Sequence, residues 1–173
     1  PALNEYAARY GESVSFFDLR WGVNTENLES EEKSSKILSV CLDEIDRCKP
    51  YMLVILGERY GWIPEPETMR AAEESREGLN LDDLEKSVTA LEIEYGALHS
   101  REQLSHTLFY FREFEGPVPD GYGQEDALRA KKLAELKTQI RKFAGDNLHT
   151  YTVSWDRGKQ VLKGMEQFAS QVT

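Results

Sequence analysis

The stretch YMLVILGERYGW at residues 51–62 decides the fold. Its first six residues are apolar, which is typical of a parallel β-strand buried on both faces, and the glycines and charges that follow mark an abrupt strand end. The run Val14–Phe17, which belongs to a short strand predicted at Val14–Leu19, ends in the same way in DLRWGV at residues 18–23. About one helix of amphipathic sequence separates the two runs. The pattern therefore predicts a βαβ unit with Tyr51–Leu56 as a central strand.

The segment between these strands is predicted to be helical from Ser30 or Glu31 to Cys48, and Pro50 closes it. Apolar side chains at i, i+3 and i+4 spacing form the stripe expected to face the core: Ile37, Val40, Cys41, Ile45 and Cys48. The remaining pattern predicts helices at Glu67–Ser75, Ser87–Arg101, Glu125–Ala144 and Gly158–Val172, and strands at Thr107–Phe111 and Leu148–Val153.

Residues Pro1–Gly11 resemble the last turns of a helix, and a helix in front of a parallel strand implies a further strand before it. We therefore expect a fragment that lacks the first strand of its domain. With that strand the order is (βα)₅, which predicts the α/β class: a flavodoxin-like, three-layer αβα sandwich with a parallel five-stranded sheet. The 173 residues, 40% of them hydrophobic, suit one domain over residues 1–173.

Composition excludes several classes of protein. A formal charge of −10 argues against nucleic-acid binding, and no apolar run is long enough to span a bilayer. Cys41 and Cys48 would lie about 10 Å apart along a helix, too far for a disulfide, so reduced cysteines and a cytoplasmic location are expected. Nucleotide-binding glycine motifs are absent, and the three dispersed histidines, His99, His106 and His149, lack metal-ligand spacing.

Polar and aromatic residues follow the two predicted strands, and ligands of open parallel sheets bind at the carboxyl ends of the strands. Arginines there could hold a phosphate or carboxylate, and tryptophans could stack on a base. The competing interpretation is structural, with an ion pair between Asp18 and Arg59 or between Arg20 and Glu58. The candidate ligand-binding residues at this edge are Asp18, Arg20, Trp21, Glu58, Arg59 and Trp62.

Glu92 lies near the start of the helix that Ser87 is expected to cap, so both residues are placed at the same edge. A carboxylate there could stabilise a developing cation such as a ribosyl oxocarbenium ion. The alternative is that Glu92 only stabilises its own helix through the macrodipole, by about 0.3–1 kcal/mol.

Five motifs in order resemble one family: DLRWGV at 18–23, CLDEIDRC at 41–48, LGERYGWIP at 56–64, SVTALEI at 87–93 and FYFR at 109–112. The family is an uncharacterised domain found N-terminal to the NACHT-type ATPase in telomerase-associated protein one, nephrocystin three and bacterial STAND relatives. It is similar in turn to Toll/interleukin-receptor (TIR) domains. That similarity implies that Arg20–Glu29 is a mobile loop. It also implies that Glu92 matches the glutamate that supports NAD cleavage, although Val88 and Thr89 replace the Trp and Cys of the TIR signature.

The resemblance implies a cytoplasmic signalling or effector domain of the kind used in innate immunity. It would act by self-association and protein–protein assembly, with ATPase and sensor or repeat domains attached in cis and no required cofactor. Whether it is also an enzyme stays open. One alternative is a TIR-like NAD nucleosidase with Glu92 as the catalytic glutamate. Another is sensing of NAD or a different nucleotide without turnover, with Arg20 or Arg59 on the phosphate and Trp21 or Trp62 on the base.

Overall fold

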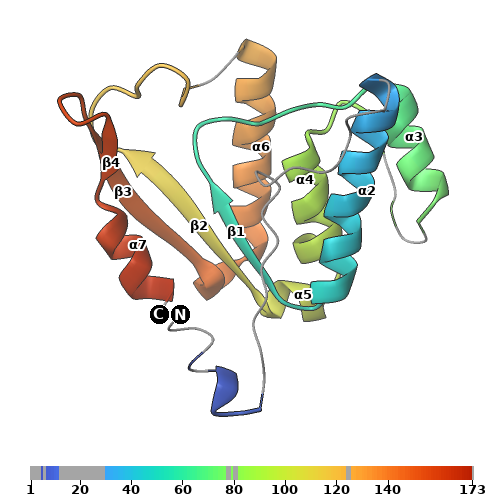
Figure 1. The fold of residues 1–173 in the computed structure, drawn as a ribbon, viewed down its shortest axis with the longest axis horizontal. Helices are drawn as coiled ribbons and strands as arrows, with labels where there is room; N and C mark the ends of the chain where they lie inside the picture. Colours follow the sequence, from blue (N-terminus) through green and yellow to red (C-terminus); the bar gives the residue numbers. More distant parts are fainter. Residues whose placement is uncertain are drawn as a thin grey trace.

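The computed structural model describes residue 5 and residues 7–11, 30–76, 79, 82–123 and 126–172. These residues form a mixed α/β fold in which helices flank a mostly parallel four-stranded sheet (Figure 1). In chain order the elements from residue 30 onward are α2 (Ser30–Cys48), β1 (Met52–Leu56), α3 (Pro66–Glu74), α4 (Val88–Ile93), the π-helix η2 (Glu94–Leu98), α5 (Arg101–Ser105), β2 (Thr107–Phe114), α6 (Ala127–Phe143), the 3₁₀-helix η3 (Gly145–Asn147), β3 (Leu148–Asp156), β4 (Val161–Lys163) and α7 (Met165–Val172).

The sheet has the strand order β1-β2-β3-β4. β1 pairs with β2 and β2 with β3 in parallel, so Val54 lies beside Phe109 and Phe109 beside Leu148. The predicted strands at 51–56, 107–111 and 148–153 and their parallel arrangement are thus confirmed. The predicted strand Val14–Leu19 lies outside the described residues, and within the described part of the chain β1 forms one edge of the sheet.

The described structure contradicts the expectation that β1 is buried on both faces. Val54 and Leu56 are 4% and 2% exposed, whereas Leu53 and Ile55 are 42% and 48% exposed. Helices α4 and α6 supply side chains that pack against Val54 and Leu56. On the opposite face α7 packs on β3 instead of β1 (Figure 1). An unbroken apolar run therefore forms a strand whose residues alternate in burial.

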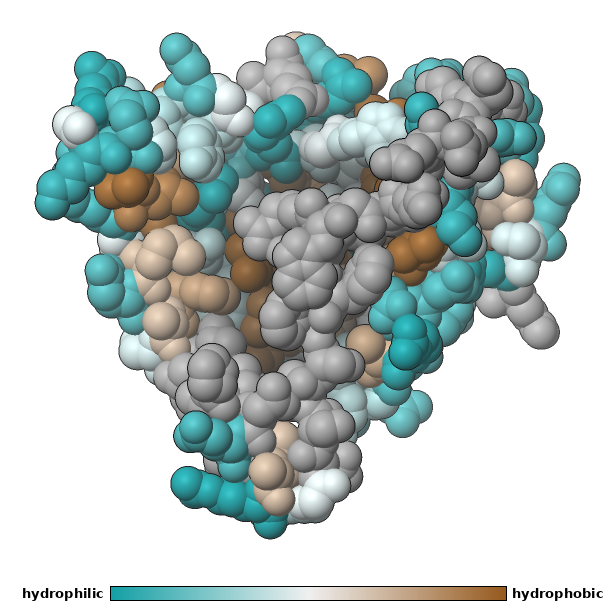
Figure 2. Space-filling model, viewed as in Figure 1, coloured by the Kyte–Doolittle hydropathy of each residue, from teal (hydrophilic) through white to brown (hydrophobic). Residues whose placement is uncertain are grey.

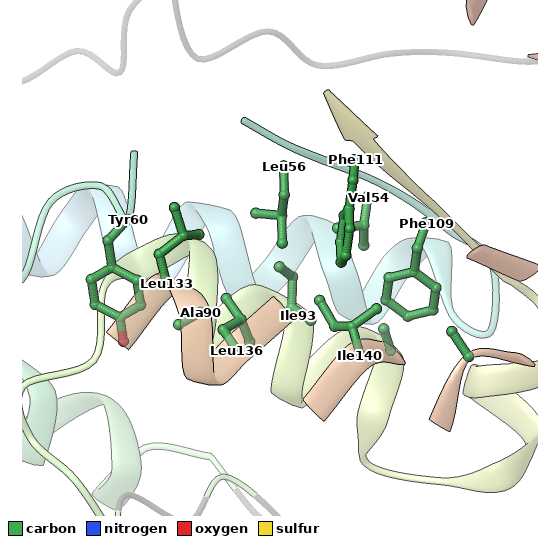
Figure 3. Close-up of a cluster of buried hydrophobic side chains, with 12 residues drawn as sticks. Val54, Leu56, Tyr60, Ala90, Ile93, Phe109, Phe111, Leu133, Leu136 and Ile140 are labelled. Carbon is green, nitrogen blue, oxygen red and sulfur yellow. The ribbon is translucent and has the colours of Figure 1, made fainter. Parts of the chain in front are cut away.

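The largest core lies between one face of the sheet and helices α4 and α6 (Figure 3). Phe109 and Phe111 of β2 are almost completely buried there. A smaller cluster on the other face joins Tyr110, Tyr151 and Val153 to Phe168 of α7. Successive side chains of β2 thus point alternately into the two cores on opposite faces of the sheet. The other members of the larger core include Val54, Leu56, Tyr60, Ala90, Ile93, Leu133, Leu136 and Ile140.

The buried face of α2 is rotated from the predicted stripe. Leu38 and Leu42 are the most buried residues of the helix, Cys41 is buried beside them, and Cys48 is exposed. Leu38 and Leu42 cluster with Met69 of α3 and with side chains of α4. The predicted stripe is expected to face the core, but the helix packs mainly on other helices, and this changes which side chains are buried.

Two predicted helices differ in the structure. The helix expected at Ser87–Arg101 changes from α4 to the π-helix η2, and Ser100 then caps the separate helix α5. The helix expected at Gly158–Val172 is wrong in its first half, because Val161–Lys163 pairs antiparallel with Ser154–Asp156 before α7 begins. The expected helices at Glu67–Ser75 and Glu125–Ala144 correspond to α3 and α6.

In the view of Figure 2, the residues at the periphery are mostly hydrophilic, and hydrophobic residues lie among them. Among the described ranges, no helix combines the length and the apolar character needed to cross a membrane.

Candidate functional site

An ion pair between Glu58 and Arg112 joins the carboxyl ends of β1 and β2. Nη2 and Nε of Arg112 donate to Oε2 of Glu58 at 2.9 and 3.3 Å. Gly57 leaves room for the guanidinium, because a Cβ at this position would overlap it and lie only 2.9 Å from Cζ. The guanidinium also lies 5.2 and 5.6 Å from the ring centroids of Phe114 and Tyr122. Arg112 is therefore held by charge and by aromatic rings at the edge where ligands were expected.

The other predicted residues of this edge are only partly described. Nη1 of Arg59 donates to the backbone oxygen of Gly121 at 3.1 Å, which ties the end of β1 to the loop after β2. The predicted pairs Asp18–Arg59 and Arg20–Glu58 each need a residue outside the described ranges, and Trp21 lies there as well. Their roles as ligand-binding residues stay predictions.

Trp62 and Ser87 meet at the start of α4. The backbone oxygen of Trp62 accepts a hydrogen bond from the Val88 amide at 3.0 Å, and Trp62 is 45% exposed. Ser87 is completely buried, and its Oγ accepts from the Ala90 amide at 3.2 Å. The predicted N-cap is confirmed, and it satisfies one of the amides that a helix start leaves without a partner.

Glu92 lines a pocket of about 370 Å³ between α2, β1 and α4. The interior of the pocket is mostly apolar, and its rim extends to Cys48 and Tyr51, which precede β1. Glu58 and Arg59 follow β1 and are not among the described residues that line this pocket. The candidate acid and the candidate arginine therefore lie toward opposite ends of β1. The other lining residues are Cys41, Glu44, Ile45, Lys49, Met52, Leu53 and Gly96.

The carboxyl group of Glu92 is electrostatically isolated. Burial raises its pKa, and a hydrogen bond from the Cys41 thiol offsets only part of this effect. Burial and the neighbouring Glu92 carboxylate raise the pKa of Cys41 to about 12, so the thiol stays protonated at neutral pH and acts as the donor. No ion pair joins Glu92 to a lysine, arginine or histidine of the described residues. An acid of this kind is stabilised when positive charge comes near it.

The π-helix η2 begins two residues after Glu92, and its Gly96 forms part of the pocket wall. Wide helical turns of this type occur frequently at functional sites. Here a Cβ on Gly96 would lie 2.8 Å from Sδ of Met52 and 2.9 Å from Cγ2 of Ile45, so the glycine permits close packing of η2 on α2 and β1. The adjacent Tyr95 donates its hydroxyl to Asp46 of α2 at 2.7 Å. These contacts fix the wall of the pocket relative to α2.

Two lysines that sequence reasoning did not single out line another cavity, of about 470 Å³, between α4, η2 and α6. Nζ of Lys86 lies 2.6 Å from both Asp82 and Glu94, and Nζ of Lys132 lies 2.7 Å from Asp83. Burial lowers the pKa of each lysine, but the carboxylates outweigh it and the pKa of each is raised. Because these charges are already paired, the cluster fastens the segment before α4 to α6.

The Glu92 pocket therefore combines a mostly apolar lining with an acid that forms no ion pair among the described residues. Such a group can bind a positive charge or exchange a proton. In the described part of the chain, no three His, Cys, Asp or Glu side chains gather closely enough to hold a metal ion. Arg112 was missed although it directly follows the strand predicted at Thr107–Phe111, which in the structure extends to Phe114. Cys41 was missed because its sequence position predicts only a core residue.

Comparison with known proteins gives one family match and several long relatives. The model of DUF4062, a domain of unknown function, matches residues 13–163. Telomerase protein component 1 of mouse is 28% identical over 189 residues, which cover 99% of this chain and 7% of that protein. The rat protein of the same name is 27% identical, again with 99% and 7% coverage. A TPR repeat-containing protein of Dictyostelium discoideum is 28% identical over 145 residues, with 75% and 8% coverage.

The chain thus spans less than a tenth of the length of these curated relatives. No solved structure matches the chain.

Proposed function

The chain belongs to the DUF4062 family, and from this premise we propose that it is the N-terminal signalling domain of a STAND (NACHT-type) ATPase. It acts by protein–protein assembly when the attached domains oligomerise it. The size of the relatives supports this proposal, because the chain corresponds to a small part of each. Two relatives are tetratricopeptide-repeat proteins by name, which supports repeat domains attached in cis.

One structural observation carries the assembly proposal. Leu53, Ile55 and Leu108 are 42%, 48% and 39% exposed, and Leu53 lies directly beside Leu108 in the parallel register of β1 and β2. Leu53 and Ile55 share one face of β1, since alternate residues of a strand point the same way. Adjoining exposed apolar side chains mark surfaces that bind other proteins. We call these three residues the apolar row.

A charge placed in the apolar row tests the proposal. Ile55→Lys combined with Leu108→Lys should abolish self-association of the full-length protein, measured by mass photometry with ATP present. Leu128→Lys is the matched control, because Leu128 is equally exposed but lies at the start of α6. Retained secondary structure by circular dichroism shows that the variants fold. Unchanged association of the double variant would contradict assembly through this surface.

The loop Arg20–Glu29 forms a second part of the proposed assembly surface. Charge reversals at Glu26 and Glu29 test it in the same mass-photometry assay, and loss of association is the expected result. Association that is insensitive to these reversals would remove the loop from the proposal.

The second candidate function is NAD cleavage, and the isolation of Glu92 favours it. When the bond between nicotinamide and C1′ of the ribose breaks, its electron pair moves to the nicotinamide ring and positive charge develops on the ribose. A carboxylate beside that charge lowers the barrier, and water then adds to C1′ and releases a proton. No lysine, arginine or histidine of the described residues pairs with Glu92, so its carboxylate, once ionised, is open to a developing positive charge.

Chromatography of nicotinamide released from NAD by the clustered full-length protein decides between the two candidates. Glu92→Gln should abolish release, because the amide keeps the shape and removes the charge. Glu44→Gln, at the rim of the same pocket, should retain it. Release that persists in Glu92→Gln eliminates Glu92 as the catalytic residue. Binding of NAD without product would favour the sensing alternative, and neither binding nor product would leave assembly.

A further inference from the structure

The charged residues that line the Glu92 pocket differ in whether they have partners. Glu44 accepts a hydrogen bond from Arg47 at 2.8 Å. Lys49 donates to Asp46 at 2.8 Å, and its Nζ lies 3.6 Å from the centroid of the Tyr95 ring. Both of these groups lie at the rim and are neutralised locally. Among the described charged residues of this pocket, Glu92 is thus the one without an oppositely charged partner.

We infer that this pocket binds a small apolar ligand that carries one primary ammonium group, with the ammonium on the Glu92 carboxylate. Cys41 already donates its S–H to this carboxylate, and the remaining lone pairs can accept further donors. The inference goes beyond assembly, and it competes with the NAD alternative for the same pocket, since both place positive charge beside Glu92.

The rest of the lining determines the body of the ligand. Ile45, Met52 and Leu53 contribute apolar surface, and Gly96 exposes no side chain. A volume of about 370 Å³ lies in the lower part of the range of small-molecule sites, about 300–1,000 Å³. A second polar group on the ligand would lose its hydration without gaining a partner at these residues. These residues therefore favour an alkyl or aryl body on the ligand, in contrast to the ribose that the NAD alternative would place beside Glu92.

Binding of an ammonium ion must depend on pH. The carboxylate is the binding form, so a ligand that meets a protonated Glu92 displaces its proton. Affinity should rise as pH increases through the raised pKa of Glu92, and fall again near the pKa of the amine, about 10.4 for a lysine-like group. The other titratable groups that line the pocket are Cys41, Glu44, Cys48, Lys49 and Tyr51.

Calorimetric titration with n-hexylamine and 1-hexanol tests this inference, because the two probes share length and differ in charge. At pH 8 the amine should bind the wild-type chain at least tenfold more tightly than the alcohol. Glu92→Gln should bind both probes equally, and Glu44→Gln should keep the preference. Equal binding of the two probes to wild type, or binding of neither, would overturn the inference.

The two cysteines provide a second measurement that needs no variant. Cys48 is exposed at the pocket rim, whereas Cys41 is buried and its pKa of about 12 keeps it unreactive. Saturating hexylamine should slow alkylation of Cys48 by iodoacetamide several-fold, and equimolar hexanol should not. An unchanged alkylation rate would contradict occupation of this pocket. Nicotinamide release is measured separately, so failure of NAD cleavage and failure of amine binding are distinguishable.

Discussion

Leu56 and Ile55 are neighbours in the same apolar run, but their substitution by alanine should have very different effects. Leu56 is 2% exposed and belongs to the core formed with α4 and α6, so Leu56→Ala removes buried contacts and leaves a cavity. Such changes cost about 2–5 kcal/mol of unfolding free energy. Ile55 is 48% exposed, so about half of its side chain stays in water in the folded chain. Ile55→Ala should cost about 1 kcal/mol.

Thermal unfolding translates these energies into temperatures. For a domain of this size, 1 kcal/mol lowers Tm by about 2–4 °C, so Leu56→Ala should lower it by roughly 5–15 °C and Ile55→Ala by only a few degrees. Urea titrations with unchanged m values would show that the unfolded states are comparable. An equally large loss of stability from Ile55→Ala would refute the alternating burial of β1.

Three further changes test other parts of the structure. Gly57→Ala should displace the Arg112 guanidinium and lower stability by about 1–3 kcal/mol in urea unfolding. Gly123→Ala should be nearly neutral, because a Cβ there would meet only Cγ1 of Val118, at an ordinary contact distance of 3.8 Å; equal effects of the two changes would contradict the close approach. Ser87→Ala should cost about 1 kcal/mol through the lost N-cap, and an unchanged urea midpoint would argue against it. Because the pKa of Glu92 is raised in the folded state, ionisation of Glu92 destabilises the fold as pH rises above the pKa of the unfolded chain, about 4.3. Glu92→Gln should therefore raise Tm at pH 7 and lose this gain below about pH 4. A gain in Tm that is constant with pH would contradict the burial of Glu92.

The strands and their parallel order could be predicted because long apolar runs and turn residues are local signals. The strand at 51–56, the helix that begins at Ser30 and the Ser87 cap all follow from a few adjacent residues. What β1 packs against is not local. Whether Ile55 is covered depends on the position of α7, about a hundred residues later in the chain.

The C-terminal hairpin was missed for a related reason. Val161–Lys163 is too short to show alternation, and its strand conformation comes from pairing with the end of β3. At Gly164 the backbone has φ +92°, and a Cβ there would collide with the backbone of Thr152. Gly164 therefore marks the turn into α7. The prediction of one helix over Gly158–Val172 did not take this glycine into account.

The candidate site was predictable in its residue types and only partly in its geometry. Glu92 could be singled out as an acid near a helix start, but its sequence position does not show that it faces Cys41 of α2. The partner of Glu58 is Arg112, which directly follows the predicted strand Thr107–Phe111, but that position does not show which acid the arginine pairs with. Side-chain partners across elements depend on packing, which a local sequence pattern does not encode.

The brevity of β4 limits how copies of this chain can join. A three-residue strand offers about 10 Å of hydrogen-bonding edge, and the chain turns away into α7 directly after it. A neighbouring molecule that added a strand here would gain few backbone bonds, so continuous intermolecular sheets of the amyloid type cannot grow from this side. Copies that meet at this edge must therefore recognise one another through side chains, which leaves their spacing and number open to control by the domains that carry them.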